Sequence, residues 1–327
     1  MTSLNSFQTN VFQINKQNFD DHALRLFLYQ SANNHIYREY IRYLGINPFN
    51  IQHLDQVPFL PIQFFKHHQV TTEAAAHAHV FESSGTTGVT SKHYIHDLSF
   101  YTRVSASIFT DFFGQLQGSV VIGLLPSYLE RGNSSLVYMV NHFIAMSKHR
   151  LSGFYLHHQD ELAKKLESLR GSDVPVYLFG VTFALLDMAK NHPIDIGNVH
   201  IIETGGMKGR GEELTREALH GILKSAFNTP RVYSEYGMTE LLSQAYLGNE
   251  DLFKSPEWMK VKIRDMYDPF SYVKEGKTGG INVIDLANAH SCAFIETEDI
   301  GVAEQDGFKV LGRMDNSDLR GCNLLIS

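Results

Sequence analysis

The sequence predicts an α/β fold whose main sheet is largely parallel, and three observations lead to this prediction. From about residue 118 onward, short apolar stretches alternate with segments of helical periodicity, as in parallel sheets flanked by helices. Three polar runs, at 83–92, 204–211 and 234–240, each follow a predicted strand, and such sheets bind ligands at the carboxyl ends of their strands. The last stretch, about 270–327, changes to short strands separated by glycine turns, which indicates a small β-rich portion.

The region before the alternation is expected to be helical and then extended. Apolar residues recur at helical spacing over 18–45, and Gly45 is a plausible end of this helix. In the stretch 57–70, Pro58 and Pro61 exclude a continuous helix, and the aromatic run indicates a buried extended segment. The letters HAHVFESSGTTG then indicate a strand that enters a loop.

The alternating region and the last stretch supply the remaining predicted elements. The expected strands of the sheet are GSVVIGLLP, VPVYLFGV, NVHIIETGG and PRVYSEYGMTE. The helices expected between them are SSLVYMVNHFIAM, TFALLDMAKNH and GEELTREALHGILKSAF. The β-rich portion is expected to contain the short strands GGINVIDLANAH, CAFIETEDIGV and GFKVLGR.

Composition excludes several classes of protein. The 327 residues are 43% hydrophobic and 19% charged, which is typical of a folded chain with a sizeable core. A formal net charge of −7 argues against a nucleic acid or an anionic membrane as the main partner. The first residues lack the apolar core of a signal peptide, and no apolar stretch is long enough to span a bilayer. The two cysteines, Cys292 and Cys322, form no disulfide framework, so we expect a cytoplasmic location.

The run SSGTTGVTSK has the composition of a phosphate-binding loop. Glycines let the backbone approach a phosphate closely, hydroxyls add hydrogen-bond donors, and Lys92 adds a positive charge. The spacing of Gly85, Gly88 and Lys92 does not match a Walker loop, and no serine is bracketed as in a nucleophile elbow. Taken alone, the run is equally compatible with an ordinary surface loop.

This run also resembles the phosphate loop of the adenylate-forming superfamily, with Thr90 where proline is usual. That superfamily comprises acyl-CoA synthetases, firefly-luciferase-like enzymes and the adenylation domains of peptide synthetases. Later segments resemble its further motifs in the family's own order: LLPSYLERGN, LFGVTFALLDMAK, ETGGMKGRGEEL, YSEYGMTE, ETEDIG and DGFKVLGRMDNSDLRG. The segments FLPIQFFKHH, TGGMKGRGEEL and GRMDNSDLRGCNLL look like the acyl-protein synthetases of bacterial luminescence, the LuxE type.

The resemblance implies a large domain of the adenylate-forming type, with layered parallel-rich sheets flanked by helices. We expect it over 1–310, with a β-rich subregion at about 270–310 and a hinge-like tail over 311–327. Family members carry a further C-terminal domain whose lysine completes adenylation, and the sequence shows no counterpart. Lys92, Lys208 or a partner protein is expected to substitute, or adenylation is slow.

The implied reaction is the activation of a carboxylic acid by ATP, with Mg²⁺, as an acyl-adenylate. Glu240 would ligate Mg²⁺, a cation that prefers carboxylate and phosphate oxygens, and Thr239 would donate to the α-phosphate. Both residues also fit a helix start. The leaving pyrophosphate would be bound by Ser83, Ser84, Gly85, Thr86, Thr87, Gly88 and Lys92.

The nucleoside is expected to lie against the later motifs. Gly205 and Gly206 would let the backbone lie flat along adenine, and Tyr236 with Gly237 would border the adenine or phosphate site. Tyr236 fits a core aromatic equally well. Asp299 would accept hydrogen bonds from the ribose hydroxyls, and Arg313 would bind ribose or phosphate.

The acyl group is expected to pass to a thiol, on a protein, a carrier protein or coenzyme A. Cys322 is the candidate acceptor within the chain, with Arg320 nearby to lower its pKa, although a small buried residue is the alternative. Cys292 fits a strand core, and the many histidines fit surface or core positions better than a metal site.

Two other functions stay open at this point. The chain fits a coenzyme A ligase for fatty or aryl acids, since apolar segments at 128–143 and 178–190 suit either acid but also suit core packing. It also fits a non-catalytic subunit that binds nucleotide or acyl chain within a larger complex.

Overall fold

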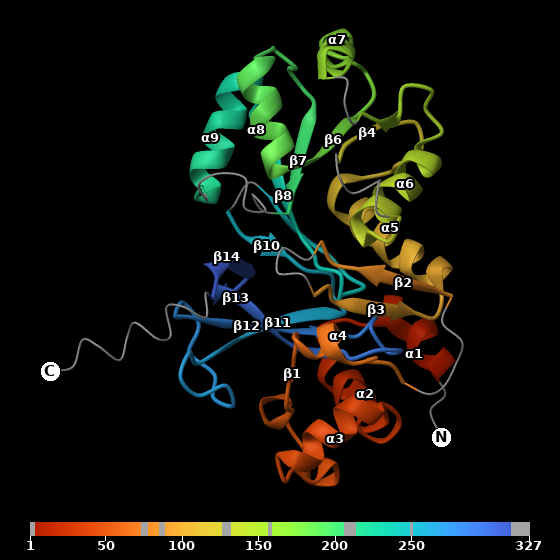
Figure 1. Cartoon of the computed structure of the whole chain (residues 1–327), viewed down its shortest axis with the longest axis vertical. Helices are drawn as coiled ribbons and strands as arrows, with labels where there is room; N and C mark the ends of the chain where they lie inside the picture. Colours follow the sequence, from red (N-terminus) through yellow and green to blue (C-terminus); the bar gives the residue numbers. More distant parts are fainter. Residues whose placement is uncertain are drawn as a thin grey trace, which may run out of the picture. The chain divides into compact units, whose positions relative to one another are not determined.

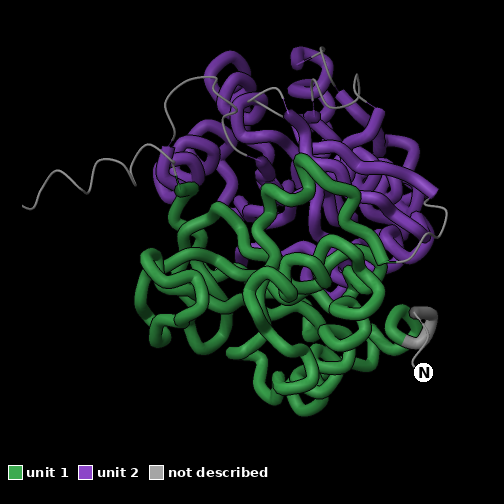
Figure 2. The backbone as a smooth tube through the Cα atoms, turned by 60° about the horizontal axis from the view of Figure 1, so that its bottom comes forward, with its two compact units in different colours: residues 1–75, 251–327 green, residues 76–250 purple. Residues whose placement is uncertain are grey.

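The computed structural model describes residues 4–72, 78–84, 89–125, 132–155, 159–205, 214–248 and 251–314. The chain divides into two compact units, which Figure 2 distinguishes by colour. Unit 1 combines Met1–Ala75 with Asp251–Ser327, and unit 2 is Ala76–Glu250. The domain bounds expected from the sequence, 1–310 and 311–327, stay a prediction.

Unit 2 contains the predicted parallel sheet. Five strands run parallel in the order β5, β4, β6, β7, β8, and β9 pairs antiparallel with β8. Their bounds are β4 Val120–Leu124, β5 Gly153–Phe154, β6 Val176–Val181, β7 His200–Thr204, β8 Val232–Tyr236 and β9 Ala245–Leu247. Every residue of β4 and β6 is buried, as expected where helices cover both faces of a sheet.

Helices lie along both faces of this sheet (Figure 1). On one face, Phe109 of α5 contacts the rings of Tyr177 and Phe179 on β6, and Phe143 of α6 joins them. On the other face, Leu185 of α8 packs directly onto Gly180, where a Cβ atom would lie 2.5 Å from the leucine. The helices of unit 2 are α5 Leu98–Phe113, α6 Ser135–Ser147, α7 Gln159–Ser168, α8 Thr182–Asn191 and α9 Arg216–Phe227.

These elements confirm the predicted alternation. The three helices expected between strands are α6, α8 and α9, and the expected strands are β4, β6, β7 and β8. Local sequence explains their ends: Ser134 and Thr215 cap α6 and α9 through their hydroxyls, and Asn228 ends α9 in the left-handed conformation.

The polar run 83–92 lies in a different kind of structure from the other two runs. It connects β2 His79–Glu82 to β3 Lys92–Ile95, which pair antiparallel as a two-stranded sheet. The predicted strand before the run is confirmed. Lys92, however, opens the returning strand opposite Glu82, so the run is the connection of a hairpin rather than the exit of a parallel strand.

Unit 1 contains the predicted β-rich portion. Its strands pair antiparallel in the order β11, β12, β13, β14, β10, and β1 adds parallel to β13. Their bounds are β1 Leu60–Pro61, β10 Phe253–Lys254, β11 Met259–Arg264, β12 Thr278–Asp285, β13 Phe294–Glu304 and β14 Gly307–Arg313. Its helices are α1 Leu4–Asn10, α2 Phe19–Asn33, α3 His35–Tyr43 and α4 Phe64–His67. Short 3-10 turns cover Val11–Gln13, Pro48–Asn50 and Leu54–Gln56.

Two local expectations differ from the structure. The helix expected over 18–45 is divided at Asn34, which is fully buried and caps α3 by accepting from the Tyr37 amide. The segment 57–70, expected to be extended, turns into the single-turn helix α4 after β1. In both places a short-range capping or turn contact overrides the pattern of apolar residues. No helix in the described ranges is long and apolar enough to cross a membrane.

Gln30 is a buried polar side chain that makes hydrogen bonds to the backbone of unit 1. Its side chain is fully buried on α2, and its Nε2 atom lies 3.0 Å from the carbonyl oxygens of both Asn288 and Ala289. Its Oε1 atom accepts from the Ala293 amide at 3.0 Å. The side chain therefore satisfies the backbone of a buried loop that would otherwise lack hydrogen-bond partners.

We expect Gln30→Ala to lower the free energy of unfolding by about 2–4 kcal/mol, because several buried backbone groups lose their partner. Asp21→Asn on the same helix is the control, since the exposed Arg25–Asp21 pair should contribute less than about 1 kcal/mol. Chemical denaturation measures both. Equal stability of the Gln30→Ala variant and the parent chain would contradict the assignment.

Candidate active site

The candidate site in unit 2 begins where β7 and β8 end. Gly205 directly follows β7 with a φ of +66°, a backbone conformation that favours glycine. Gly237 directly follows β8, which ends at Tyr236. The predicted polar runs 204–211 and 234–240 therefore leave the carboxyl ends of two neighbouring parallel strands. Gly206 and Lys208 lie outside the described residues.

Two carboxylate–hydroxyl hydrogen bonds join these strand ends. Ser234 Oγ on β8 donates to Glu203 Oε1 on β7 at 2.6 Å, and Thr204 Oγ1 on β7 donates to Glu235 Oε2 on β8. The register pairs Glu203 with Ser234 and Thr204 with Glu235. Because side chains alternate along a strand, one bond lies on each face of the sheet. The two strands are therefore held together on both faces at the edge where the motifs begin.

Glu203 is buried and has several partners. Thr182 Oγ1, at the start of α8, lies 3.1 Å from Glu203 Oε2 and 2.5 Å from the carbonyl oxygen of Gly205. Arg216 Nε lies 4.0 Å from Glu203 Oε1. Burial raises the pKa of Glu203, while its bonds to Ser234 and Thr182 and the charge of Arg216 oppose this shift. Thr182 thus links the Glu203 carboxyl group to the backbone at Gly205.

Glu235 lies on the other face, against the motif that follows it. A Cβ atom at Gly237 would lie 2.2 Å from Glu235 Oε1, so a larger residue at 237 would displace this carboxyl group from its present position. Burial raises the pKa of Glu235 to about 7; the bond from Thr204 opposes this shift and the charge of Glu203 adds to it. Tyr101 of α5 and Tyr246 of β9 are further groups whose pKa its charge raises.

The segment after β8 places three predicted residues in different environments. Tyr236 and Glu240 are buried, whereas Thr239 is partly exposed. The Leu241 amide donates to the Met238 carbonyl at 3.2 Å, so Thr239 and Glu240 are the central residues of a tight turn. The Thr239 carbonyl accepts from the ring of His93 at 2.8 Å.

The base of the glycine-rich loop is closed by two serines. The Ser83 amide donates to the Ser91 carbonyl at 3.0 Å, and the Ser91 amide donates to Ser83 Oγ at 2.9 Å. Lys92 Nζ lies 3.8 Å from Glu82 Oε1, and about half of the lysine side chain is exposed. Gly85, Thr86, Thr87 and Gly88 lie outside the described residues, and Ser84 is the last described residue before them.

Unit 1 brings together the two residues predicted to hold the ribose. Asp299 on β13 lies opposite Arg313 on β14, and Arg313 Nε is 3.3 Å from Asp299 Oδ1. Asp299 is buried, whereas 73% of the Arg313 side chain is exposed. The Asp299 amide donates to Thr297 Oγ1, and the buried Arg264 donates to the Thr297 carbonyl at 2.8 Å. Cys322 lies outside the described residues.

Three residues of the candidate site were not predicted from the sequence: Glu203, Glu235 and His93. Glu235 carries no clear signal in the sequence, because it follows Ser234 in a strand whose residues alternate between buried and half-buried. For Glu203 a signal was available, because it directly follows the apolar residues Ile201 and Ile202 of a predicted strand. A buried carboxylate at such a position needs partners. His93 carries no comparable signal, since its partner is 146 residues away in the sequence.

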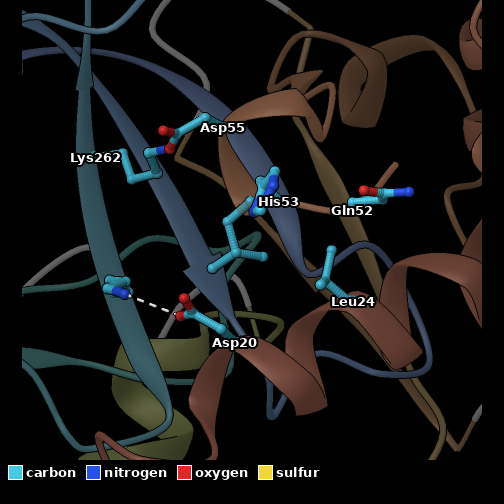
Figure 3. Close-up of a pocket in the computed structure, with 8 residues that line it drawn as sticks. Asp20, Leu24, Gln52, His53, Asp55 and Lys262 are labelled. Carbon is cyan, nitrogen blue, oxygen red and sulfur yellow. Dashed lines mark hydrogen bonds and ion pairs between the residues drawn. The ribbon is translucent and has the colours of Figure 1, made fainter. Parts of the chain in front are cut away.

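The structure also has features that lie apart from these residues. Figure 3 shows a pocket of unit 1, about 360 Å³ in volume, lined by Asp20, Leu24, Gln52, His53, Leu54, Asp55, Lys260 and Lys262. Its lysines pair with its aspartates, and none of its residues belongs to the predicted site. Within the described ranges, no three His, Cys, Asp or Glu side chains are grouped to hold a metal ion.

The pKa of Glu235 predicts a dependence of stability on pH. Its folded pKa of about 7 lies above the ordinary value of 4.5, so folding favours the protonated form. The resulting stabilisation is full below pH 4.5 and is lost as the pH rises through 7. Between pH 5 and 8 the free energy of unfolding of the parent chain should fall as Glu235 ionises. We expect this fall to be about 1–3 kcal/mol smaller in Glu235→Gln, which cannot ionise.

Unfolding measured at a series of pH values tests this expectation. Glu167→Gln, at an exposed position of α7, is the matched control and should follow the parent chain. Parallel stability curves for the parent chain and Glu235→Gln would show that Glu235 does not titrate in this range.

The chain is similar to known proteins in sequence and in fold. No protein-family model matches the chain. Among curated proteins, it is 23% identical to the long-chain-fatty-acid–luciferin-component ligase of Aliivibrio fischeri, over 96% of this chain and 89% of the relative.

Two solved structures illustrate the fold. ATP-bound MatB from Rhodopseudomonas palustris matches with a TM-score of 0.56 and 16% identity, over 74% of this chain and 49% of MatB. A 2-hydroxyisobutyryl-CoA ligase in complex with 2-HIB-AMP and CoA matches with a TM-score of 0.68 and 14% identity, over 94% and 71%. The chain thus spans about half the length of MatB. It has the fold of the adenylate-forming enzymes, and its expected resemblance to an acyl-protein synthetase is confirmed along almost its whole length.

Proposed function

We propose that this chain activates a carboxylic acid with ATP and transfers the acyl group to a thiol. In the first step the carboxylate attacks the α-phosphorus, forming acyl-adenylate and releasing pyrophosphate. In the second step a thiol displaces AMP and becomes a thioester. The observation that carries the proposal is the Thr239–Glu240 turn at the carboxyl end of β8, in a chain matched along 96% of its length by a fatty-acid ligase.

The relative's name favours a fatty acid as the substrate, with an aryl acid as the alternative. The apolar residues of the segment 178–190 do not decide between them. Phe179 and Leu185 pack in the core of unit 2, so their apolar character is explained without a substrate. The substrate class is therefore a matter for direct measurement.

The residues of unit 2 fit the phosphate side of the reaction. Ser83, Ser84, the loop 85–88 and Lys92 would bind the phosphates, and Thr239 would donate to the α-phosphate. Glu240 supplies one buried carboxyl group shortly after the end of β8, and the described residues offer no cluster of three acids. This set fits Mg²⁺, which binds through one or two carboxylates together with phosphate oxygens and water. When bound, the ion would offset negative charge on the phosphates.

The nucleoside side is assigned to two further groups. Gly205, Gly206, Tyr236 and Gly237 would border the adenine, and Asp299 with Arg313 would bind the ribose. The Arg313–Asp299 contact supports this assignment, because it places a guanidinium, which donates hydrogen bonds, beside a carboxyl group that accepts them, on neighbouring strands. These roles are proposals that rest on the motifs.

The environment of Cys292 argues against this cysteine as the acceptor thiol. This cysteine is fully buried, and burial raises its pKa to about 12, so its reactive thiolate is disfavoured. Cys322 is the internal acceptor we propose, and a thiol of another protein or a carrier protein is the external one. Coenzyme A is the alternative acceptor, favoured by the fold shared with the CoA-bound ligase. A cytoplasmic location is part of the proposal.

We expect ATP–pyrophosphate exchange that requires Mg²⁺ and is stimulated by fatty acids more than by aryl acids. Glu240→Ala should reduce this exchange by about 100-fold or more, since it removes the charge-bearing group proposed to hold the ion. Glu167→Ala on the exposed face of α7 is the control and should exchange normally. Undiminished exchange in Glu240→Ala would sink the metal assignment.

Exchange absent with every acid, alongside measurable ATP binding, would favour the non-catalytic subunit instead. Labelled fatty acid found on the wild-type chain but not on Cys322→Ser would identify the internal acceptor. Label passing only to added coenzyme A would favour the ligase alternative.

A further inference from the structure

His93 joins two segments of unit 2 that the motifs assign to the phosphate site. It follows Lys92 on β3, is almost fully buried, and its Nδ1 atom lies 2.8 Å from the carbonyl oxygen of Thr239. A carbonyl oxygen only accepts hydrogen bonds, so the ring must donate through Nδ1–H. This bond connects the hairpin that carries the glycine-rich loop with the turn that carries Glu240.

The hairpin holds His93 in a defined place. Phe81, its partner across β2 and β3, is fully buried, and the bonds between Ser83 and Ser91 continue the pairing of the two strands towards the loop. Lys92 and His93 point to opposite sides of the strand, which leaves the lysine exposed while the ring is enclosed. Packing around the His93 ring therefore holds its Nδ1–H donor in one position.

The acceptor belongs to a segment with little regular structure of its own. The turn from Met238 to Leu241 is closed by one backbone hydrogen bond, and that bond leaves the Thr239 carbonyl outside the turn. The His93 ring supplies a hydrogen-bond partner for this part-buried carbonyl. Because Thr239 and Glu240 share a planar peptide unit, holding this carbonyl also holds the backbone N and Cα atoms of Glu240.

We propose that His93 is a positioning residue for adenylate formation, which orients the Thr239–Glu240 turn relative to Lys92. This inference rests on the proposed function and adds to it a residue that contacts neither substrate nor metal. Losing the bond would leave the fold intact but let the turn shift, and displacements near 1 Å in such sites cost about 100-fold in rate.

Two substitutions separate this role from general packing. In His93→Asn the amide nitrogen occupies about the position of Nδ1, so the bond to the Thr239 carbonyl is kept. In His93→Gln the amide lies one bond further out, near the position of Nε2, and the bond is lost. Replacing the exposed His96 on the same hairpin, His96→Gln, is the matched control.

We expect His93→Gln to lower kcat for ATP–pyrophosphate exchange by about 10–100-fold and to raise the Mg²⁺ concentration needed for half-maximal exchange. His93→Asn should recover most of both, with similar melting temperatures for the two variants. Equal loss in both, or loss that only follows melting temperature, would overturn the positioning role. If His93→Gln does not fold, His93→Ala is used, and imidazole should restore its exchange; no restoration would also overturn it.

Calorimetric binding of ATP with and without Mg²⁺ separates this inference from the proposed function. A wild-type chain that shows no exchange but binds ATP more tightly with Mg²⁺ would overturn catalysis alone. The asparagine and glutamine variants would then be compared by their Mg²⁺-dependent gain in affinity, which only the glutamine variant should lose. A wild-type chain without any Mg²⁺-dependent ATP binding would overturn both.

Discussion

The candidate site of unit 2 depends on two carboxylates at the ends of β7 and β8. Glu203 accepts from Ser234 on one face of the sheet, and Glu235 accepts from Thr204 on the other. Hydrogen bonds to charged groups in a poorly solvated place are worth about 1.5–3 kcal/mol each, and leaving such a group without a partner costs more. If the strand ends separated, a carboxyl group would become exposed or would lose its hydrogen-bond partner. The segments that follow β7 and β8 therefore start from fixed positions.

The same carboxylates explain the small residues around them. The Glu235 carboxyl group occupies the space that a side chain at residue 237 would need, so Gly237 leaves room for it. On the other face, the Thr182 hydroxyl reaches both Glu203 and the Gly205 carbonyl, which ties the exit of β7 to the start of α8. Gly237, which the sequence analysis assigned to ligand binding, thus also makes room for a neighbouring carboxyl group.

Unit 1 uses a related device with the charge reversed. Arg264 is buried beneath β12 and β13, where its guanidinium donates to the carbonyls of Ile281 and Thr297. Its space is made by Gly280, where a Cβ atom would lie 2.4 Å from the guanidinium carbon. Thr297 in turn holds the Asp299 amide, so a buried arginine supports the strand that presents the proposed ribose-binding carboxylate.

The sequence by itself determined the α/β class, the alternation of β4, β6, β7 and β8 with α6, α8 and α9, and the β-rich last portion, but not β5 or α7. Those features follow from local periodicity and turn chemistry, which each segment carries within a few residues. The family resemblance also selected Asp299 and Arg313 as candidates, and the structure places them opposite each other on β13 and β14.

Only the tertiary structure decided which distant groups meet. The bond from His93 to Thr239 and the partners of Glu203 and Glu235 join segments far apart in the chain. The pairing of β2 with β3 around the run 83–92 is also decided by strand register. Such pairings depend on strand register and on which faces are covered, and shifting a register by one residue would turn every side chain to the other face. Local patterns do not encode that choice, because it is made by the free energy of the packed chain as a whole.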